Sequence, residues 1–171
     1  MKKILIFVLA LLMAVPVLGQ KLSKEEKAAR NAALYETMIK SIEDSTWAYV
    51  PESYQNDDGV ECLLSTNVDF ITFEKGVVVV QGAVVCNNSY TNLAEVKSID
   101  YNRDKKGNLK SITIVVMGRH IHGTYKIILP KVNNGNGVNV IYTQSSGPAK
   151  RSRGPILPSK AAVVWKQSIP E

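Results

Sequence analysis

After its first apolar segment, the chain shows two hydrophobic patterns in succession. Between about Ser23 and Glu43, apolar side chains recur every three to four residues, which is the period of a helix with one buried face. Ser23 and Glu26 have the spacing of a capping box, in which a hydroxyl and a carboxylate satisfy free amides at the start of a helix. The pattern predicts one amphipathic helix over about 23–43, with its first turns in solvent and its last turns docked.

After Asp44 the chain becomes a series of short β-type runs separated by turn residues. The expected strands are 46–50, 61–65, 68–73, 77–85, 96–102, 110–117, 124–129, 138–143 and 161–165. The polar or Gly- and Pro-rich segments 52–59, 87–89 and 145–158 are predicted to be loops. No strand–helix–strand alternation is present, so the sheet should be antiparallel. We expect a mainly β fold with one N-terminal helix: an antiparallel meander curled into a barrel or half-barrel, lipocalin-like in outline.

The segment MKKILIFVLALLMAVPVLGQ at the start of the chain has the composition of a secretory signal peptide. Its apolar run is shorter than the ~20 residues that a membrane-spanning helix needs. We predict a signal peptide over 1–19 and a single β-rich domain over 20–171, exported to the periplasm or outside the cell and without a transmembrane segment. Losing Lys2 and Lys3 lowers the formal net charge from +6 to +4, which gives no reason to expect a nucleic-acid partner.

Two cysteines, Cys62 and Cys86, belong to the predicted mature chain. In an oxidising compartment an even pair favours a disulfide, which here would close a loop of about 25 residues. Both residues lie in apolar surroundings, so two separate buried thiols are the alternative. The sequence does not decide between these two states.

Both histidines lie in the segment GRHIHG, residues 118–123. Its two glycines and its place between two expected strands predict a polar hairpin loop. His120 and His122 could supply at most two of the three or four ligands of a zinc site. A metal-dependent hydrolase is therefore kept as the last alternative. The sequence also lacks a Gly-x-Ser-x-Gly elbow and a phosphate-binding glycine loop, so we expect a protein that is not an enzyme and has no cofactor.

The leading hypothesis is a binding module for a small apolar or amphipathic ligand, or for a segment of a partner. The candidate ligand-binding residues are the strand aromatics Trp47, Tyr49, Phe70, Tyr125 and Tyr142. Trp47, Tyr49 and Tyr125 fall on one alternation face of their strands. Because strand aromatics also build ordinary hydrophobic cores, a filled interior is the alternative.

The densest local charge is the basic segment around Arg151, in the expected loop 150–160. The candidate partner-binding residues there are Lys150, Arg151, Arg153 and Lys160. They could contact an anionic glycan, a lipid head group or a partner protein, and so support a second hypothesis, an interaction or structural protein of the cell envelope. No aromatic residue interleaves with them, which argues against single-stranded nucleic acid. A solvated loop is the alternative.

Several segments together resemble a known family. They are TWAYVP at 46–51, STNVDFITFEKGVVVV at 65–80, LKSITIVVMGRHIHGTYKIIL at 109–129 and GVNVIYTQ at 137–144. With the leader and the Lys-, Glu- and Ala-rich helix, they are similar to a family of small exported proteins from Bacteroides-type bacteria, catalogued as a domain of unknown function. The resemblance implies export and a β fold, and it assigns no catalytic residues.

Overall fold

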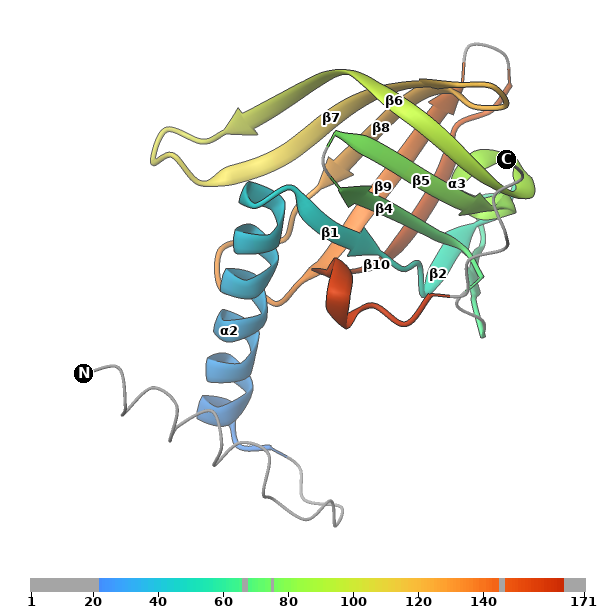
Figure 1. Cartoon of the computed structure of the whole chain (residues 1–171). Coiled ribbons are helices and arrows are strands. Elements are labelled where there is room, and N and C mark those ends of the chain that lie inside the picture. Colours follow the sequence, from blue (N-terminus) through green and yellow to red (C-terminus); the bar gives the residue numbers. More distant parts are fainter. Residues whose placement is uncertain (1–21, 66–67, 75, 145–146, 165–171) are drawn as a thin grey trace.

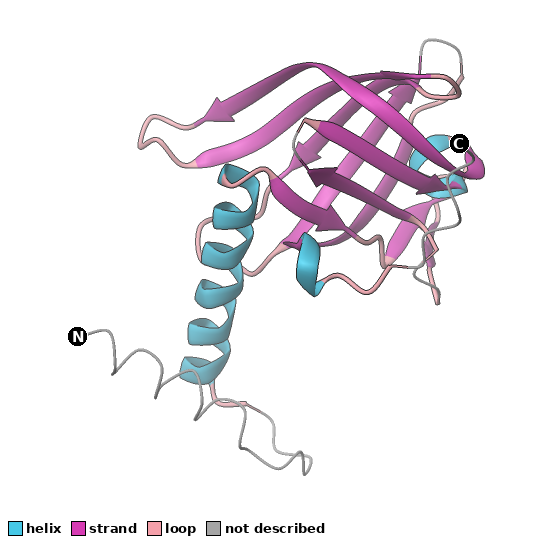
Figure 2. Cartoon of the chain, in the orientation of Figure 1, coloured by secondary structure: helices cyan, strands magenta, loops and turns pink. Residues whose placement is uncertain are grey.

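The computed structural model of the chain, in which residues 22–65, 68–74, 76–144 and 147–164 are described, is built around an antiparallel β-barrel (Figures 1 and 2). The predicted signal peptide, 1–19, lies outside the described residues. Within the described part of the chain, no helix has both the length and the apolar character that crossing a membrane requires.

Among the described residues, ten strands form one sheet. They are β1 (Thr46–Tyr49), β2 (Ser53–Gln55), β3 (Glu61–Leu63), β4 (Phe70–Glu74), β5 (Val77–Gly82), β6 (Asn88–Arg103), β7 (Leu109–Gly118), β8 (His122–Ile128), β9 (Gly137–Gln144) and β10 (Lys150–Pro158). Eight strands pair in the order β1-β4-β5-β6-β7-β8-β9-β10, and β10 pairs again with β1. The predicted antiparallel barrel is confirmed, and it is closed. β2 and β3 form a hairpin that pairs with a different part of β10.

The N-terminal helix α2 (Lys24–Glu43) forms where the hydrophobic period predicted it. The amide of Glu26 donates to Ser23 Oγ at 3.1 Å, and the amide of Ser23 donates to Glu26 Oε2 at 2.8 Å, so the capping box is present. Figure 1 shows the first turns extending away from the barrel. The last turns dock against it, with Met38 and Ile42 each only 1% exposed.

The barrel interior is filled by side chains from alternate strand positions. Along β7, Ile112, Ile114 and Val116 are at most 2% exposed, while Thr113 and Val115 between them are partly exposed. The same alternation along the other strands builds one hydrophobic core. Each large side chain buried in this way contributes roughly 1.5–3 kcal/mol, so inward packing is the main stabilising term of the barrel.

The prediction of a loop over 145–158 is wrong, because Lys150–Pro158 is strand β10, which closes the barrel. Its Gly and Pro residues stand where a strand tolerates them. Pro155 lies opposite Gly137, the first residue of β9, so its missing amide falls at the end of that ladder. Pro158 is the last residue of the strand.

Four other boundaries differ from the prediction. β2 lies inside the expected loop 52–59, and β6 begins within the expected loop 87–89. The expected strand 77–85 ends at Gly82, whose φ of 111° other residues rarely adopt, and continues as a short helix α3 (Ala83–Cys86). The 3₁₀ turn η1 (Ser159–Ala161) overlaps the start of the expected strand 161–165, whose last residue lies outside the described part.

We predict that Gly154→Ala destabilises the barrel by roughly 1–3 kcal/mol, because a Cβ at Gly154 would overlap the carbonyl oxygen of Val50 and lie 2.8 Å from the Cα of Pro51. The measurement is urea unfolding followed by circular dichroism. Gly137→Ala is the matched control on the neighbouring strand, since nothing lies within 4 Å of a Cβ placed there. Equal stability of the two variants would contradict the prediction.

Candidate functional site

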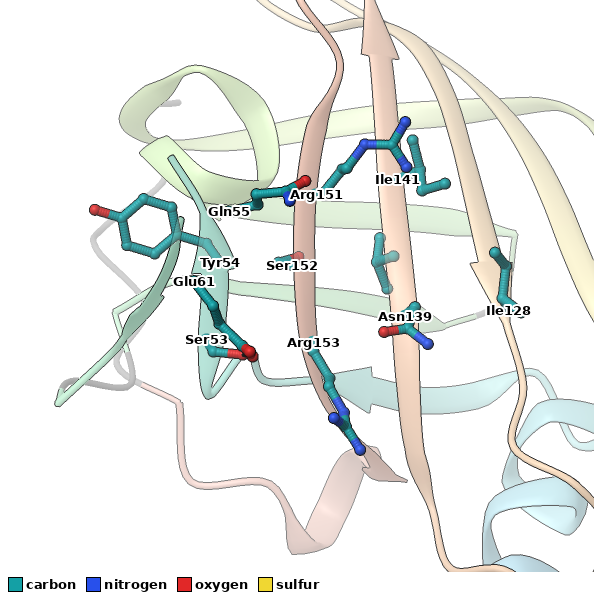
Figure 3. Close-up of a pocket in the computed structure, with 11 residues that line it drawn as sticks. Ser53, Tyr54, Gln55, Glu61, Ile128, Asn139, Ile141, Arg151, Ser152 and Arg153 are labelled. Atoms are coloured by element: carbon teal, nitrogen blue, oxygen red, sulfur yellow. Dashed lines mark hydrogen bonds between the residues drawn. The ribbon is translucent and has the colours of Figure 1, made fainter. Parts of the chain in front are cut away.

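A groove lies on the outer face of the sheet, where the β2–β3 hairpin meets β10, β9 and β8 (Figure 3). Its volume is about 370 Å³. The strand register aligns two rows of side chains across it, one through Arg151 and one through Arg153. The partners on the two sides are Gln55 and Ile141 for Arg151, and Ser53 and Asn139 for Arg153. Side chains in such rows are neighbours on one face of the sheet.

Alternation along β10 directs both arginines outward. Arg151 and Arg153 are exposed, whereas Ser152 between them is 7% exposed and belongs to the inner face. Figure 3 shows both guanidinium groups extending from β10 on the side of the groove that faces β9. The groove therefore presents two positive charges from successive positions on one face of a strand.

Positively charged side chains outnumber negatively charged ones in and beside the groove. Within the described part of the chain, neither Arg151 nor Arg153 forms an ion pair. Lys126 is exposed two strands away in the same row as Arg151, and adds a third positive charge. On the opposite wall stands the carboxylate of Glu61, which accepts a hydrogen bond from Ser53 Oγ at 2.6 Å. Positive charge predominates, which favours an anionic ligand.

A buried hydrogen bond fixes the inner side of the groove floor. The hydroxyl of Tyr49 donates to Ser152 Oγ at 2.9 Å inside the barrel. Burial raises the pKa of Tyr49 well above its usual value, so the hydroxyl stays protonated and remains a donor. The strand that carries the two arginines is thus tied to β1 beneath them.

Three of the four predicted partner-binding residues lie on β10, and two of these line the groove. Lys150 lies on the other alternation face, with its Nζ 3.8 Å from Asp57 Oδ1. Lys160 is exposed in η1, beyond the other end of β10, and does not line the groove. The structure therefore divides the basic segment and brings only Arg151 and Arg153 together with polar residues of β2, β3 and β9.

The five predicted ligand-binding aromatics are all at most 2% exposed, and none lines the groove. Trp47, Tyr49, Tyr125 and Tyr142 belong to the core, which confirms the shared alternation face of the first three. The rings of Tyr125 and Tyr142 stack with centroids 4.7 Å apart. Phe70 lies outside this cluster, because it alternates with the inward-facing Ile71 on β4.

The hydroxyl groups of Tyr125 and Tyr142 are satisfied within the protein. Tyr125 donates to the carbonyl oxygen of Val85 at 2.8 Å, and Tyr142 donates to that of His122 at 3.3 Å. Trp47 packs against Phe73 with ring centroids 5.7 Å apart. These contacts are those of a packed core, in agreement with the alternative that the sequence left open.

The histidine segment forms the predicted hairpin turn. β7 ends at Gly118 and β8 begins at His122, and the amide of Gly118 donates to the carbonyl oxygen of Ile121 at 2.7 Å. His120 and His122 are both exposed. Across the described ranges, no group of three or more His, Cys, Asp and Glu side chains is arranged to hold a metal ion.

The two cysteines are free thiols, so the possible Cys62–Cys86 disulfide is not formed in this structure. Cys62 lies on β3, whereas Cys86 ends α3 and is buried in the core, 2% exposed. Burial raises the pKa of Cys86 to about 11, although hydrogen bonds from its surroundings oppose this rise. A thiol of that pKa is protonated at neutral pH and is a poor nucleophile.

Sequence reasoning did not single out Ser53, Glu61 and Asn139, which share the groove with the arginines. Their proximity depends on pairing between distant strands, for which a single sequence gives no local signal. The signal that could have helped is the spacing of Arg151 and Arg153 around Ser152, because a two-residue alternation is typical of a strand with one outward face, but the segment was predicted to be a loop and the arginines were singled out by charge alone.

The hydrogen bond beneath the groove is testable. We predict that Tyr49→Phe lowers the free energy of unfolding by about 1 kcal/mol, because it leaves the buried Ser152 hydroxyl without its donor. Ser152→Ala combined with Tyr49→Phe in a double-mutant cycle should show coupling between the two residues. Tyr101→Phe is the control, since Tyr101 is 42% exposed and should change stability by less than ~0.5 kcal/mol. Additive effects of the paired substitutions would contradict the prediction.

A second prediction concerns Asp69, which is 7% exposed and accepts a hydrogen bond from the amide of Val84 at 3.3 Å. Burial raises the pKa of Asp69 in the folded protein. The buried Asp69 side chain therefore contributes fully to the stability of the protein when the pH is below the pKa that Asp69 has in the unfolded chain. This contribution is lost as the pH rises through the pKa that Asp69 has in the folded protein. Asp69→Asn keeps an acceptor oxygen but does not ionise. The stability of the wild type relative to this variant should fall from about pH 4 upward, as measured by urea unfolding at successive pH values. If the free energies of unfolding of the wild type and of Asp69→Asn changed with pH in parallel, the prediction would be wrong.

The barrel with its N-terminal helix is similar to a solved structure of known family. No family model and no curated protein matches the chain. Among solved structures, the crystal structure of a DUF4251 family protein from Bacteroides eggerthii matches with a TM-score of 0.66. The two chains are 19% identical, and the match covers 79% of this chain and 94% of the other. The expected resemblance to a domain-of-unknown-function family is thus confirmed at the level of the fold.

Proposed function

We propose that the protein is an exported, non-enzymatic binding module that holds a segment of a partner in its outer groove. The observation that carries this proposal is the pair Arg151 and Arg153, which project together into an open groove of about 370 Å³ without ion-pair partners among the described residues. Because both side chains stand on a paired strand, no backbone has to be ordered when a partner binds, and complementary charge supplies the recognition.

The chemistry of the groove supports binding rather than catalysis. Ser53 donates its hydroxyl hydrogen to Glu61, but the lining includes no imidazole or thiol that could act with it. The buried thiol of Cys86 is held in its protonated form away from the groove. Recognition by charge and hydrogen bonds is the function that these side chains support best.

The surface groove is favoured over a ligand site inside the barrel. Binding of an apolar ligand between Tyr125 and Tyr142 would require their stacked rings to separate and their hydroxyl hydrogen bonds to break. The groove is already open and needs no such rearrangement. The partner is expected in the periplasm or outside the cell, because the leader has the composition of a signal peptide.

The test is site-specific photo-cross-linking in the cells that make the protein. A photoreactive residue in place of Asn139, which is exposed in the groove, should give a cross-linked product in the exported fraction. The same residue in place of Ser98, exposed on β6, should not give that product. Combining the Asn139 probe with Arg151→Glu and Arg153→Glu should abolish it. No product, or the same product from both positions, would overturn the proposal.

A further inference from the structure

We infer that the segment held in the groove is an extended acidic peptide with carboxylates at alternate positions. This inference rests on the proposed function and adds the chemistry of the ligand. It is drawn from the spacing of the two arginines and from the donors around them that are unpaired among the described residues, and the Glu61 carboxylate supplies a further test of it.

The spacing of the two arginines matches the repeat of an extended chain. Arg151 and Arg153 are two positions apart on one face of β10, so their Cα atoms are separated by about 6.5–7 Å at the usual rise of a strand. Alternate side chains of an extended peptide have the same repeat. Such a peptide running along β10 would place successive carboxylates opposite successive guanidinium groups.

The donors around the arginines suit carboxylates. A guanidinium group binds a carboxylate through two parallel hydrogen bonds, and it loses less hydration than a lysine ammonium group does. Asn139 lies beside Arg153 in the same row, and its side chain makes no hydrogen bond to other described residues. Its amide group is therefore free to donate to the same ligand. Lys126, farther along the row of Arg151, extends the positive surface.

Glu61 places a negative charge of the protein itself on the wall of the groove. Its side chain stands on the opposite wall and is held at 2.6 Å by the hydroxyl of Ser53, the residue that faces Arg153 across the strand pair. It forms no ion pair with either arginine among the described residues. Because it has the same charge as the inferred ligand, it opposes binding at this end of the groove. Neutralising Glu61 should therefore strengthen binding.

The experiment measures fluorescence anisotropy of labelled peptides with the purified exported protein. The probe is a peptide of alternating Glu and Thr, and the matched peptides replace every Glu by Gln or by Lys. The Glu peptide should bind at least tenfold more tightly than the Gln peptide, and its affinity should fall as salt is raised because charges on an open surface are screened. The Lys peptide should not bind.

Three variants locate the site. Arg151→Gln with Arg153→Gln should weaken binding of the Glu peptide at least tenfold, and Glu61→Gln should strengthen it a few-fold. Arg30→Gln with Arg119→Gln is the matched control, because both arginines are exposed outside the groove and their loss changes the net charge by the same amount as the loss of the two groove arginines. Circular dichroism of each variant establishes that the barrel is folded.

Several outcomes would overturn the inference. These are equal affinity for the Glu and Gln peptides, equal weakening by the variant that lacks Arg30 and Arg119, and inorganic phosphate displacing the Glu peptide at the peptide's own affinity, which would indicate a small-anion site. A groove-specific cross-link at Asn139 without binding of the Glu peptide would refute the acidic ligand and leave the proposed binding function standing. Absence of both the cross-link at Asn139 and the binding of the Glu peptide would refute the acidic ligand and the proposed binding function.

Discussion

The pairing of β10 with β1 closes the barrel, and the groove depends on the same strand. β10 uses one edge for β9 and the other edge for two strands in turn, β2 along Arg151–Arg153 and β1 along Ile156–Pro158. The chain passes from β1 to β2 opposite Gly154, where the absence of a side chain lets the two backbones approach. The β2–β3 hairpin therefore leaves the barrel wall at a fixed place, and its outer face becomes one side of the groove (Figures 1 and 3).

Strand alternation allows β10 to contribute to the core and to the groove at once. Ser152 and Ile156 point inward, where Ser152 bonds to Tyr49 and Ile156 packs in the core, while Arg151 and Arg153 point outward. The outward positions are free to carry charge because stability comes from the inward ones. A pair of exposed arginines on such a strand costs little folding free energy, since both guanidinium groups remain hydrated in the folded protein.

The helix and most hairpins could be predicted from the sequence, because their signals are local: the capping box of Ser23, the helical period and the glycine turns. β10 could not, because Gly154 and Pro155 have the composition of a loop, and only pairing with distant β1 and β9 makes them part of a strand. Arg151 and Arg153 were singled out from the density of basic charge, but they were assigned to a loop. Alternation correctly placed Trp47, Tyr49 and Tyr125 on one face, yet whether that face surrounds a cavity or a packed core depends on the volumes of all inward side chains together.

The likeness to the Bacteroides eggerthii protein at 19% identity shows that one barrel architecture accommodates very different sequences. Inward positions require only apolar side chains of suitable total volume, so they satisfy the fold in many combinations. Arg151, Arg153 and Asn139 are not needed for that packing, because they lie outside the core. Fold likeness therefore does not carry a binding specificity from one such barrel to another. Our proposal therefore rests on the side chains of the outer face, where Arg151 and Arg153 form no ion pair with other described residues and the Glu61 carboxylate accepts a hydrogen bond from Ser53.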